Sequence, residues 1–359
     1  MHFRFITSTP LNIVRGSGTF AGIATLAKFL RLSSNTVDLI TPTLKFPIYT
    51  IERLVFNETL RLARRPSSTI SVGFDMDGYT LAGRGRGFHA ASIKGVIADE
   101  MQFESGLTRA TMRLQARCEK LHVQRADLVI APSRYSAERI QKLYGIRNQP
   151  RIVPEAIDLG EWRRLLQFNP AQPPESRFVV LSVCRFYPRK RLPVLLGAAD
   201  RLRTKIPGLE IRIVGDGPEA PRLKCICREK NLDGIVTWLG NLSQAELARE
   251  YNRCHIFGLP SVQESFGMVF LEAMASAKPI VAARAASAPE VVRHGVLADP
   301  DNDEAFADAI ERLYRNPTLR ATLAAEASHW VNQFDAPPVA GTFLREVEQA
   351  ASMQIARKA

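Results

Sequence analysis

The stretch Glu264-Ser265-Phe266-Gly267-Met268-Val269-Phe270-Leu271-Glu272 decides the fold of this chain. It follows the apolar run HIFGLPS (255–261), which predicts a buried strand, and its own pattern predicts a helix that begins near Phe266. The first amides of a helix have no partner within the helix and lie at the positive end of its dipole. The amides of Gly267, Met268 and Val269 would therefore offer donors to an anion such as a phosphate.

The same stretch carries two carboxylates eight residues apart. Glu264 would lie in the loop before the helix, and Glu272 about two turns inside it. A phosphate site flanked by two acids suits a sugar nucleotide, with one acid for the sugar and one for the ribose. Alternatively, Glu264 is a helix N-terminal charge worth roughly 0.3–1 kcal/mol, and Glu272 is an ordinary surface residue. Spacing alone leaves both interpretations open.

Two cations follow the predicted strand FVVLSV (178–183), in the stretch CRFYPRKRL. Arg185 and Lys190 would lie at the carboxyl end of that strand, where they can neutralise a diphosphate leaving group. A solvated basic loop is the alternative. It loses weight because the loop that holds Glu264 belongs at the same edge of the sheet.

Short β-rich runs alternate with helical patterns along the whole chain, which predicts an α/β fold with two doubly wound, Rossmann-like parallel sheets that face a cleft. The expected strands are 2–7, 37–41, 69–74, 91–97, 127–133, 151–156, 178–183, 209–215, 234–240, 255–261 and 279–283. The Pro-rich stretch 167–177 is the expected linker between an N-terminal acceptor domain, 1–170, and a C-terminal nucleotide-sugar domain, 178–333. A final helix over 339–359 is expected to pack back on the first domain.

The chain has 359 residues and a net charge of +12, and its five cysteines show no paired framework. Residues 1–177 hold 25 Lys/Arg against 15 Asp/Glu, whereas residues 178–359 hold 23 against 21. A basic first half could attract an anionic lipid surface such as the inner face of a membrane, a phosphorylated acceptor or nucleic acid. Solvated helix faces rich in arginine are the alternative. We expect a cytoplasmic protein, because no signal pattern and no long apolar run occurs. Basic runs interleaved with aromatic residues are missing, so nucleic acid is not an expected partner.

Glycines mark two further turns. Gly215 opens a stretch, GDGPEA, that imitates a dinucleotide fingerprint, but Pro218 removes an amide that would face a pyrophosphate. We expect a structural turn that lines a nucleotide base. The loop Gly16-Ser17-Gly18-Thr19 is expected to open a helix at 20–31, where Ser17 and Gly18 could approach a phosphate or sugar. A bare turn is the alternative.

Asp75-Met76-Asp77 imitates the Asp-x-Asp motif with which other sugar transferases hold a divalent metal. It lies in the half of the chain away from Arg185 and Lys190, and no third ligand is evident. We therefore expect no catalytic metal, and assign these aspartates to acceptor binding or to capping of the next loop.

Together these features resemble the retaining GT-B-fold glycosyltransferases of family four. The resemblance rests on the E-x7-E stretch PSVQESFGMVFLEAMASAKPIVA, the pair in VCRFYPRKR, and the stretches IVGDGPE and WLGNLSQAELAREY. It implies that Glu264 contacts the donor sugar, that Glu272 holds the ribose, and that Arg185 and Lys190 stabilise the departing nucleoside diphosphate. Further donor contacts are expected from Phe266, Gly267, Met268, Val269, Ser17, Gly18 and Gly215.

The chain departs from that family's pattern in three places. Lys94 in ASIKGV stands near the position of a family histidine that touches the donor sugar, and is a candidate stand-in for it. Ala285-Ala286 replaces a Gly-Gly pair, and Glu155-Ala156 replaces Asn-Gly at the linker entry.

The expected function is that of a retaining, metal-independent glycosyltransferase without a cofactor. It would move a hexose from a UDP-, GDP- or ADP-sugar to a glycan, a lipid-linked acceptor or a small molecule. A non-catalytic relative that binds nucleotide sugars or glycans is the alternative, and intact Glu264 and Glu272 argue against it.

Overall fold

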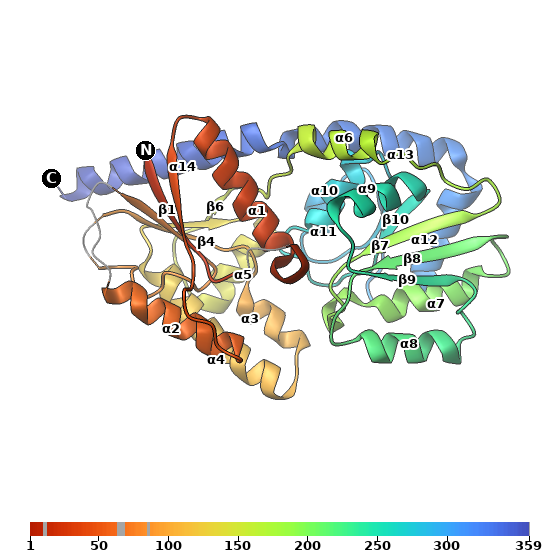
Figure 1. The fold of residues 1–359 in the computed structure, drawn as a ribbon, viewed down its shortest axis with the longest axis horizontal. Helices are drawn as coiled ribbons and strands as arrows, with labels where there is room; N and C mark the ends of the chain where they lie inside the picture. The colour runs from red at the N-terminus through yellow and green to blue at the C-terminus, as the bar shows by residue number, and fades with distance from the viewer. Residues whose placement is uncertain (10–12, 63–68, 85–86, 359) are drawn as a thin grey trace. The chain divides into compact units, whose positions relative to one another are not determined.

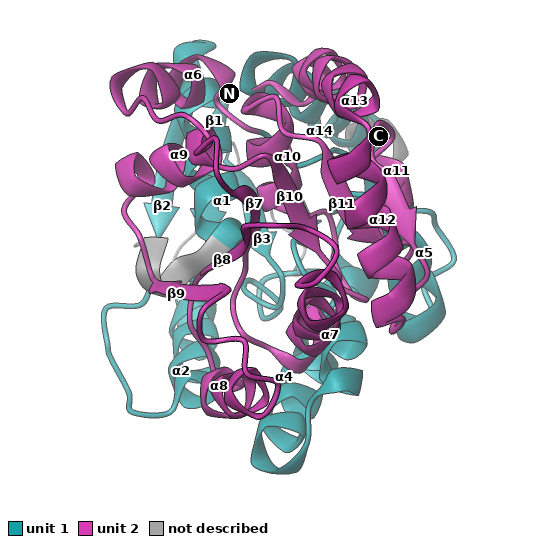
Figure 2. Ribbon diagram, turned by 90° about the vertical axis from the view of Figure 1, so that its right-hand side faces the viewer, with its two compact units in different colours: residues 1–156, 336–359 teal, residues 157–335 magenta. Residues whose placement is uncertain are grey.

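The computed structural model describes residues 1–9, 13–62, 69–84 and 87–358, except for the side chains of 13–17 and 355–358. It divides into two compact units, which Figure 2 colours separately: unit 1 is Met1–Ala156 with Ala336–Ala359, and unit 2 is Ile157–Asp335. Each unit contains one six-stranded sheet, and every strand pair is parallel. None of the described helices combines the length and apolarity that crossing a bilayer requires.

The sheet of unit 1 has the strand order β2-β1-β3-β4-β5-β6. Figure 1 labels β1, β4 and β6 of this sheet. Its strands are β1 His2–Ile6, β2 Thr36–Ile40, β3 Ile70–Phe74, β4 His89–Ser92, β5 Leu128–Ala131 and β6 Arg151–Ile152. Its helices are α1 Ile13–Leu32, α2 Tyr49–Leu62, α3 Ile97–Glu100, α4 Gly106–Arg125, α5 Arg134–Tyr144 and α14 Ala336–Lys358, with a 3-10 turn, η1, at Met101–Phe103.

Successive residues of these strands enter different cores, because side chains alternate between the two faces of a sheet. Phe3 and Phe5 of β1 pack with α1 and α14, whereas the next core residue, Ile6, packs with α2. On β4, Ala90 joins the first core and Ala91 a third one, built with α4 and α5. Helices therefore cover both faces, which leaves the carboxyl edge of the sheet to carry polar side chains.

The sheet of unit 2 has the order β12-β11-β10-β7-β8-β9. Its strands are β7 Phe178–Val183, β8 Leu209–Val214, β9 Val236–Gly240, β10 Ile256–Leu259, β11 Ile280–Ala283 and β12 Val296–Ala298. Its helices are α6 Leu159–Phe168, α7 Leu192–Leu202, α8 Ala220–Glu229, α9 Gln244–Arg253, α10 Met268–Ala275, α11 Ala288–Val291, α12 Asp303–Arg315 and α13 Pro317–Trp330, with 3-10 turns η2 Pro188–Lys190 and η3 Val331–Phe334. One continuous core fills this unit.

The unit boundary lies at Ala156–Ile157, not in the predicted linker 167–177. Helix α6 belongs to unit 2, because Trp162 is buried in its core and donates from Nε1 to Ser276 Oγ at 3.0 Å. Asn252 Nδ2 also donates to the carbonyls of Leu166 and Asn169, both at 2.9 Å. The polar Pro-rich stretch is therefore a connection within unit 2.

Three further elements differ from the prediction. Helix α1 begins at Ile13, so the Gly16–Thr19 stretch is helical rather than a loop. Strand β4 lies at His89–Ser92 instead of 91–97, because Asp75 Oδ1 accepts from the amides of Lys94 and Gly95 and turns the chain there. Strand β12, only three residues long, was not predicted.

Phe343 of α14 is expected to be essential for unit 1. Its buried ring lies 6.0 Å from the ring of Phe3 and 6.3 Å from that of Phe5. Phe343→Ala should lower the free energy of unfolding by about 3 kcal/mol, because it leaves a cavity in the core. Denaturant unfolding followed by far-UV circular dichroism measures this loss, and tryptophan fluorescence follows unit 2 separately because all three tryptophans lie there.

Gln349→Ala on the exposed side of the same helix is the matched control and should change stability little. A loss below about 1 kcal/mol for Phe343→Ala would contradict this packing.

Candidate functional site

The predicted loop-to-helix site forms between β10 and α10, and Gly267 fixes where the helix begins. Gly267 has φ 92°, and a Cβ there would lie 2.5 Å from a ring carbon of Phe270, so only glycine fits. The helix starts at Met268, two residues later than predicted. Its Phe270 amide donates to the Gly267 carbonyl at 2.9 Å. The amides of Gly267, Met268 and Val269 donate to none of the described residues, as expected at a helix start.

The loop before this helix is held from both sides. Phe266 is a core residue, with its ring 5.4 Å from that of Phe334, so only its backbone is available to a donor. Ser287, at the start of α11, donates from Oγ to the Phe266 carbonyl at 3.1 Å and from its amide to the Glu264 carbonyl at 3.3 Å. These bonds fix the backbone that carries Glu264.

Glu264 and Lys190 form an ion pair, with Nζ 2.5 Å from Oε1 and both side chains about one-tenth exposed. Lys190 comes from η2, after β7, and Glu264 comes from the loop after β10. Since β7 and β10 are parallel neighbours, their carboxyl ends meet at one edge. Arg185, two residues after β7 and half-buried, lies at the same edge. The predicted meeting of these three residues at one sheet edge thus follows from the topology.

Glu272 lies in the second turn of α10, half-buried beside Tyr251 of α9. The Tyr251 hydroxyl is 3.1 Å from Glu272 Oε2 and 3.1 Å from the Val269 carbonyl oxygen. Burial raises the pKa of Glu272 to about 7, although the hydrogen bond from Tyr251 opposes the shift. Tyr251 was not predicted as part of the site. It lies on α9, which β10 separates from α10, so no motif spacing in the sequence links it to Glu272.

Gly215 is a glycine for packing reasons. It has φ 120°, and a Cβ would lie 1.9 Å from the Cys184 carbonyl oxygen, while its amide donates to the Gly240 carbonyl at 2.7 Å. The turn therefore brings the ends of β7, β8 and β9 together. This geometry agrees with the expected structural turn.

In unit 1, two departures from the family pattern meet each other. Lys94 Nζ lies 2.8 Å from Glu155 Oε1, and both side chains are less than one-tenth exposed. Lys94 follows β4 and Glu155 follows β6, so both stand at the carboxyl edge of their sheet. The two positions at which the sequence departs from the pattern it resembles thus form one ion pair.

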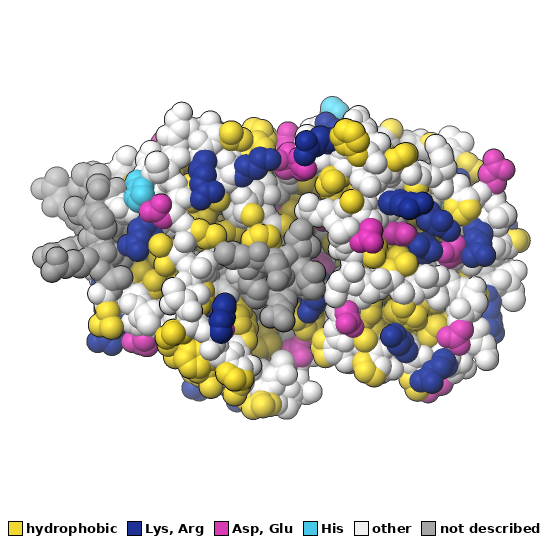
Figure 3. Space-filling model, viewed as in Figure 1, with side chains coloured by type: hydrophobic (Ala, Val, Ile, Leu, Met, Phe, Trp, Pro, Cys, Tyr) yellow, Lys and Arg dark blue, Asp and Glu magenta, His cyan; other side chains and the backbone are white. Residues whose placement is uncertain are grey.

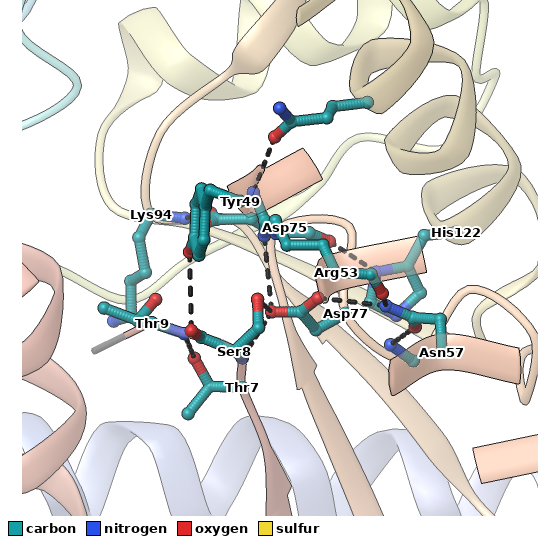
Figure 4. A network of polar contacts seen from close by, with 12 residues as sticks. Thr7, Ser8, Thr9, Tyr49, Arg53, Asn57, Asp75, Asp77, Lys94 and His122 are labelled. Carbon is teal, nitrogen blue, oxygen red and sulfur yellow. Dashed lines mark hydrogen bonds and ion pairs between the residues drawn. The ribbon is translucent and has the colours of Figure 1, made fainter. Parts of the chain in front are cut away.

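The two aspartates of Asp75-Met76-Asp77 have different surroundings (Figure 4). Asp77 is fully buried: its Oδ2 accepts from the amide and hydroxyl of Ser8, both at 2.7 Å, and lies 3.3 Å from Arg53 Nη2. Asp75 has φ 54° and is half-buried, and burial raises its pKa to about 6. Asp77 therefore anchors the fold, whereas Asp75 caps the turn that carries Lys94.

His122 fixes this strained position from behind, with Nδ1 2.5 Å from the Asp75 carbonyl oxygen and Nε2 2.8 Å from His89 Nε2. Among the described residues, no group of three or more His, Cys, Asp or Glu is placed to hold a metal.

Ser17 and Gly18 do not form the expected loop. Both lie within α1, so their backbone amides are inside a helix and not at its start. The Ser17 side chain lies outside the described residues.

The two parallel Rossmann-like sheets define the GT-B fold. The structure has a TM-score of 0.81 to a sucrose-phosphate synthase from Thermosynechococcus elongatus, at 20% identity, over 97% of this chain and 99% of that one. Residues 164–330, within unit 2, match the family described as glycosyl transferases group 1. The match covers just under half of the chain, and it agrees with the glycosyltransferase resemblance found in the sequence.

Two curated relatives belong to the same class. A D-inositol 3-phosphate glycosyltransferase from Nocardioides sp. is 32% identical over 231 residues, which is 58% of this chain and 50% of the relative. A GDP-mannose-dependent alpha-(1-6)-phosphatidylinositol monomannoside mannosyltransferase from Mycobacterium tuberculosis is 26% identical over 223 residues, 57% of each protein. The matched part of this chain thus spans about half the length of these relatives.

The Lys190–Glu264 ion pair is expected to show strong coupling in a double-mutant cycle. Lys190→Met and Glu264→Gln should each lower the free energy of unfolding by about 1–3 kcal/mol, because each leaves a mostly buried polar group without its partner. The double variant should lose at least about 1 kcal/mol less than the sum. The exposed pair Arg201–Asp303, with side chains 46% and 40% exposed, is the control cycle, with an expected coupling below about 1 kcal/mol. Additive losses at Lys190 and Glu264 would show that the two side chains do not interact in solution.

Glu272 is expected to make stability fall with rising pH. An acid with a raised folded pKa brings no penalty below its unfolded pKa, near 4.5, and the full penalty above its folded pKa, about 7. Glu272→Gln, which imitates the neutral acid, should equal the parent at about pH 4 and exceed it by on the order of 2 kcal/mol at about pH 8. Thermal unfolding across this range tests the prediction. Equal pH profiles for the two proteins would contradict the raised pKa.

Proposed function

We propose that the protein is a retaining glycosyltransferase that moves a hexose from a nucleoside-diphosphate sugar to an acceptor, without a metal. The observation that carries this proposal is the Lys190–Glu264 ion pair beside the open amides at the start of α10. At one sheet edge, a cation and unpartnered amides suit the negative diphosphate, and an acid suits the hydroxyls of the sugar.

The diphosphate would bind to the amides of Gly267, Met268 and Val269, with Arg185 and Lys190 supplying positive charge. As the nucleoside diphosphate departs, negative charge develops on its bridging oxygen, and donors already in place stabilise it without reorganisation. Lys190 would then turn from Glu264 toward the phosphate. Glu264 would become free to accept from hydroxyls of the donor sugar, which orients the sugar and stabilises positive charge near its anomeric carbon.

The ribose would bind to Glu272. Tyr251 occupies the side of Oε2, so Oε1 can accept from the ribose hydroxyls. The ionised carboxylate is the better acceptor. Nucleotide binding would therefore strengthen as the pH rises through the pKa of Glu272.

Metal independence is supported by the use of the carboxylates in unit 1. Asp77 already accepts from Ser8 and Asn57 and pairs with Arg53, and Asp75 accepts from two backbone amides. The cations of unit 2 supply the charge that a divalent ion would otherwise provide.

The acceptor would bind at the carboxyl edge of the unit 1 sheet. Asp75 offers a half-buried carboxylate with one oxygen oriented by two amides, and its strained backbone is typical of functional positions. Lys94 would contact the donor sugar from this edge, held in place by Glu155. Relatives named for inositol 3-phosphate and phosphatidylinositol monomannoside favour a phosphorylated or lipid-linked acceptor.

Purified protein should hydrolyse slowly, or transfer, one of UDP-glucose, GDP-mannose or ADP-glucose, with activity unchanged by EDTA. Glu264→Gln should lower turnover by about 10²–10³-fold, because it removes a contact formed with the charged transition state, while nucleoside diphosphate still binds. NMR of the first product should show the anomeric configuration of the donor.

Glu175→Gln, at an exposed acid in unit 2, is the matched control and should retain full turnover. Donor binding without any turnover in the parent protein would instead favour a non-catalytic sugar-nucleotide binder. Normal turnover in Glu264→Gln would refute the assigned site.

A further inference from the structure

The segment Leu44–Ile51, which leads into α2, exposes an unusual amount of apolar surface. Five of its eight side chains are large, hydrophobic and exposed: Leu44, Phe46, Ile48, Tyr49 and Ile51. Leu44 and Ile48 are each more than half exposed, at 56% and 53%. Monomeric soluble proteins seldom leave such groups together in water, and those that do generally use them for binding. We name this stretch the apolar segment.

The apolar segment is held in one conformation by Glu52 of α2. The buried Glu52 carboxylate accepts from the amide of Phe46 at 3.2 Å and from Lys45 Nζ at 3.0 Å. The Ile48 carbonyl in turn accepts from the amides of Ile51 and Glu52. Its apolar side chains therefore face solvent from a hydrogen-bonded loop and from the first turn of α2.

Helix α4 exposes cations without acids. Arg109, Arg113 and Arg117 recur every four residues and so form one stripe, which Lys120 extends. None of these four cations is paired with an acid among the described residues. The one acid of α4, Glu119, is fully buried. Leu107 and Leu114, two turns apart and 79% and 42% exposed, run beside this stripe.

A buried joint fixes the apolar segment to α4. Gln115 of α4 donates from Nε2 to Thr50 Oγ1 at 2.7 Å and accepts from Arg53 Nη1 at 3.0 Å. The exposed neighbours of this joint are Ile51 and Leu114, one on each element. Figure 3 shows hydrophobic side chains grouped over α2, at the lower left of the view. The apolar segment and the α4 stripe are thus rigidly connected.

We propose that the apolar segment and the exposed face of α4 together form a docking surface for an anionic lipid bilayer. Aliphatic and aromatic side chains enter the boundary between headgroups and acyl chains, while arginines remain at the level of anionic headgroups. The charge of unit 1 is complementary to such a surface: it holds 25 Lys/Arg against 14 Asp/Glu, whereas unit 2 holds 23 against 22.

Tyr49 connects this surface to the acceptor edge. Its ring is partly exposed in the apolar segment, and its hydroxyl lies 3.4 Å from the Ser8 carbonyl oxygen, within the network of Figure 4. A lipid headgroup beside the docked segment would therefore lie next to the edge that carries Asp75. This extension to a lipid-linked acceptor rests on the proposed function, whereas membrane binding does not.

Co-sedimentation with vesicles tests the surface without any donor sugar. The full chain should bind vesicles of phosphatidylcholine mixed with phosphatidylglycerol and should be released by salt, because salt screens charge. Arg109→Gln/Arg113→Gln/Arg117→Gln should weaken binding on the order of a hundredfold, since each cation near an anionic surface contributes about fivefold. Phe46→Ser/Ile48→Ser should weaken binding at both low and high salt, because it removes apolar contacts with the bilayer, which salt does not screen.

Lys224→Gln/Arg228→Gln/Arg249→Gln removes the same charge from exposed positions of unit 2 and should retain binding. Binding lost equally in this control would refute a localised surface, as would no binding by the parent protein. A second copy as the occupant would appear as a dimer that Phe46→Ser/Ile48→Ser dissociates while vesicle binding persists, and that result would also overturn the proposal. Unchanged circular dichroism confirms folding of each variant. Hydrolysis of the donor in solution tests the proposed function separately.

Discussion

Parallel strand pairing is the constraint on which the rest of this structure depends. Because every strand of a parallel sheet runs in the same direction, each loop that follows a strand emerges at one edge. That rule brings Lys190 to Glu264 although 74 residues separate them in sequence. It also brings Lys94 to Glu155 in the other unit. Each unit thus assembles its charged groups at one edge, while its helices exclude water from both faces.

The parts of the fold that the sequence predicted best are those in which local pattern and global position agree. Strand β7 has the predicted bounds, 178–183, because a run of apolar β-formers buried on both faces has no other stable place. The unit boundary was misplaced because composition marks a polar loop without revealing what it joins. The Gly16–Thr19 stretch is helical although glycine disfavours helices, so the surrounding residues of α1 decide its conformation. Strand β12 is too short to show a period.

The candidate site divides in the same way. Motif spacing placed Glu264, Glu272 and the two cations on one unit, and the topology agrees. The partners that give these groups their properties came from elsewhere: Tyr251 on α9 beside Glu272, and Ser287 on α11 behind Glu264. Lys94 and Glu155 stood as two separate departures from a family pattern in the sequence, and only the three-dimensional structure shows that their side chains form an ion pair. Long-range polar contacts leave no periodic trace in a sequence.

The chain leaves unit 1 after Ala156 and re-enters it at Ala336, and the two crossings are bonded to each other through Ile157 and Asp335. Unit 2 is therefore an insertion whose ends are adjacent. During synthesis, all of unit 2 emerges before helix α14 exists. Unit 2 can fold as soon as it is made, whereas Phe3 and Phe5, which are made before it, wait for Phe343 to cover them. Of the two units, the one whose translation begins earlier is thus completed later.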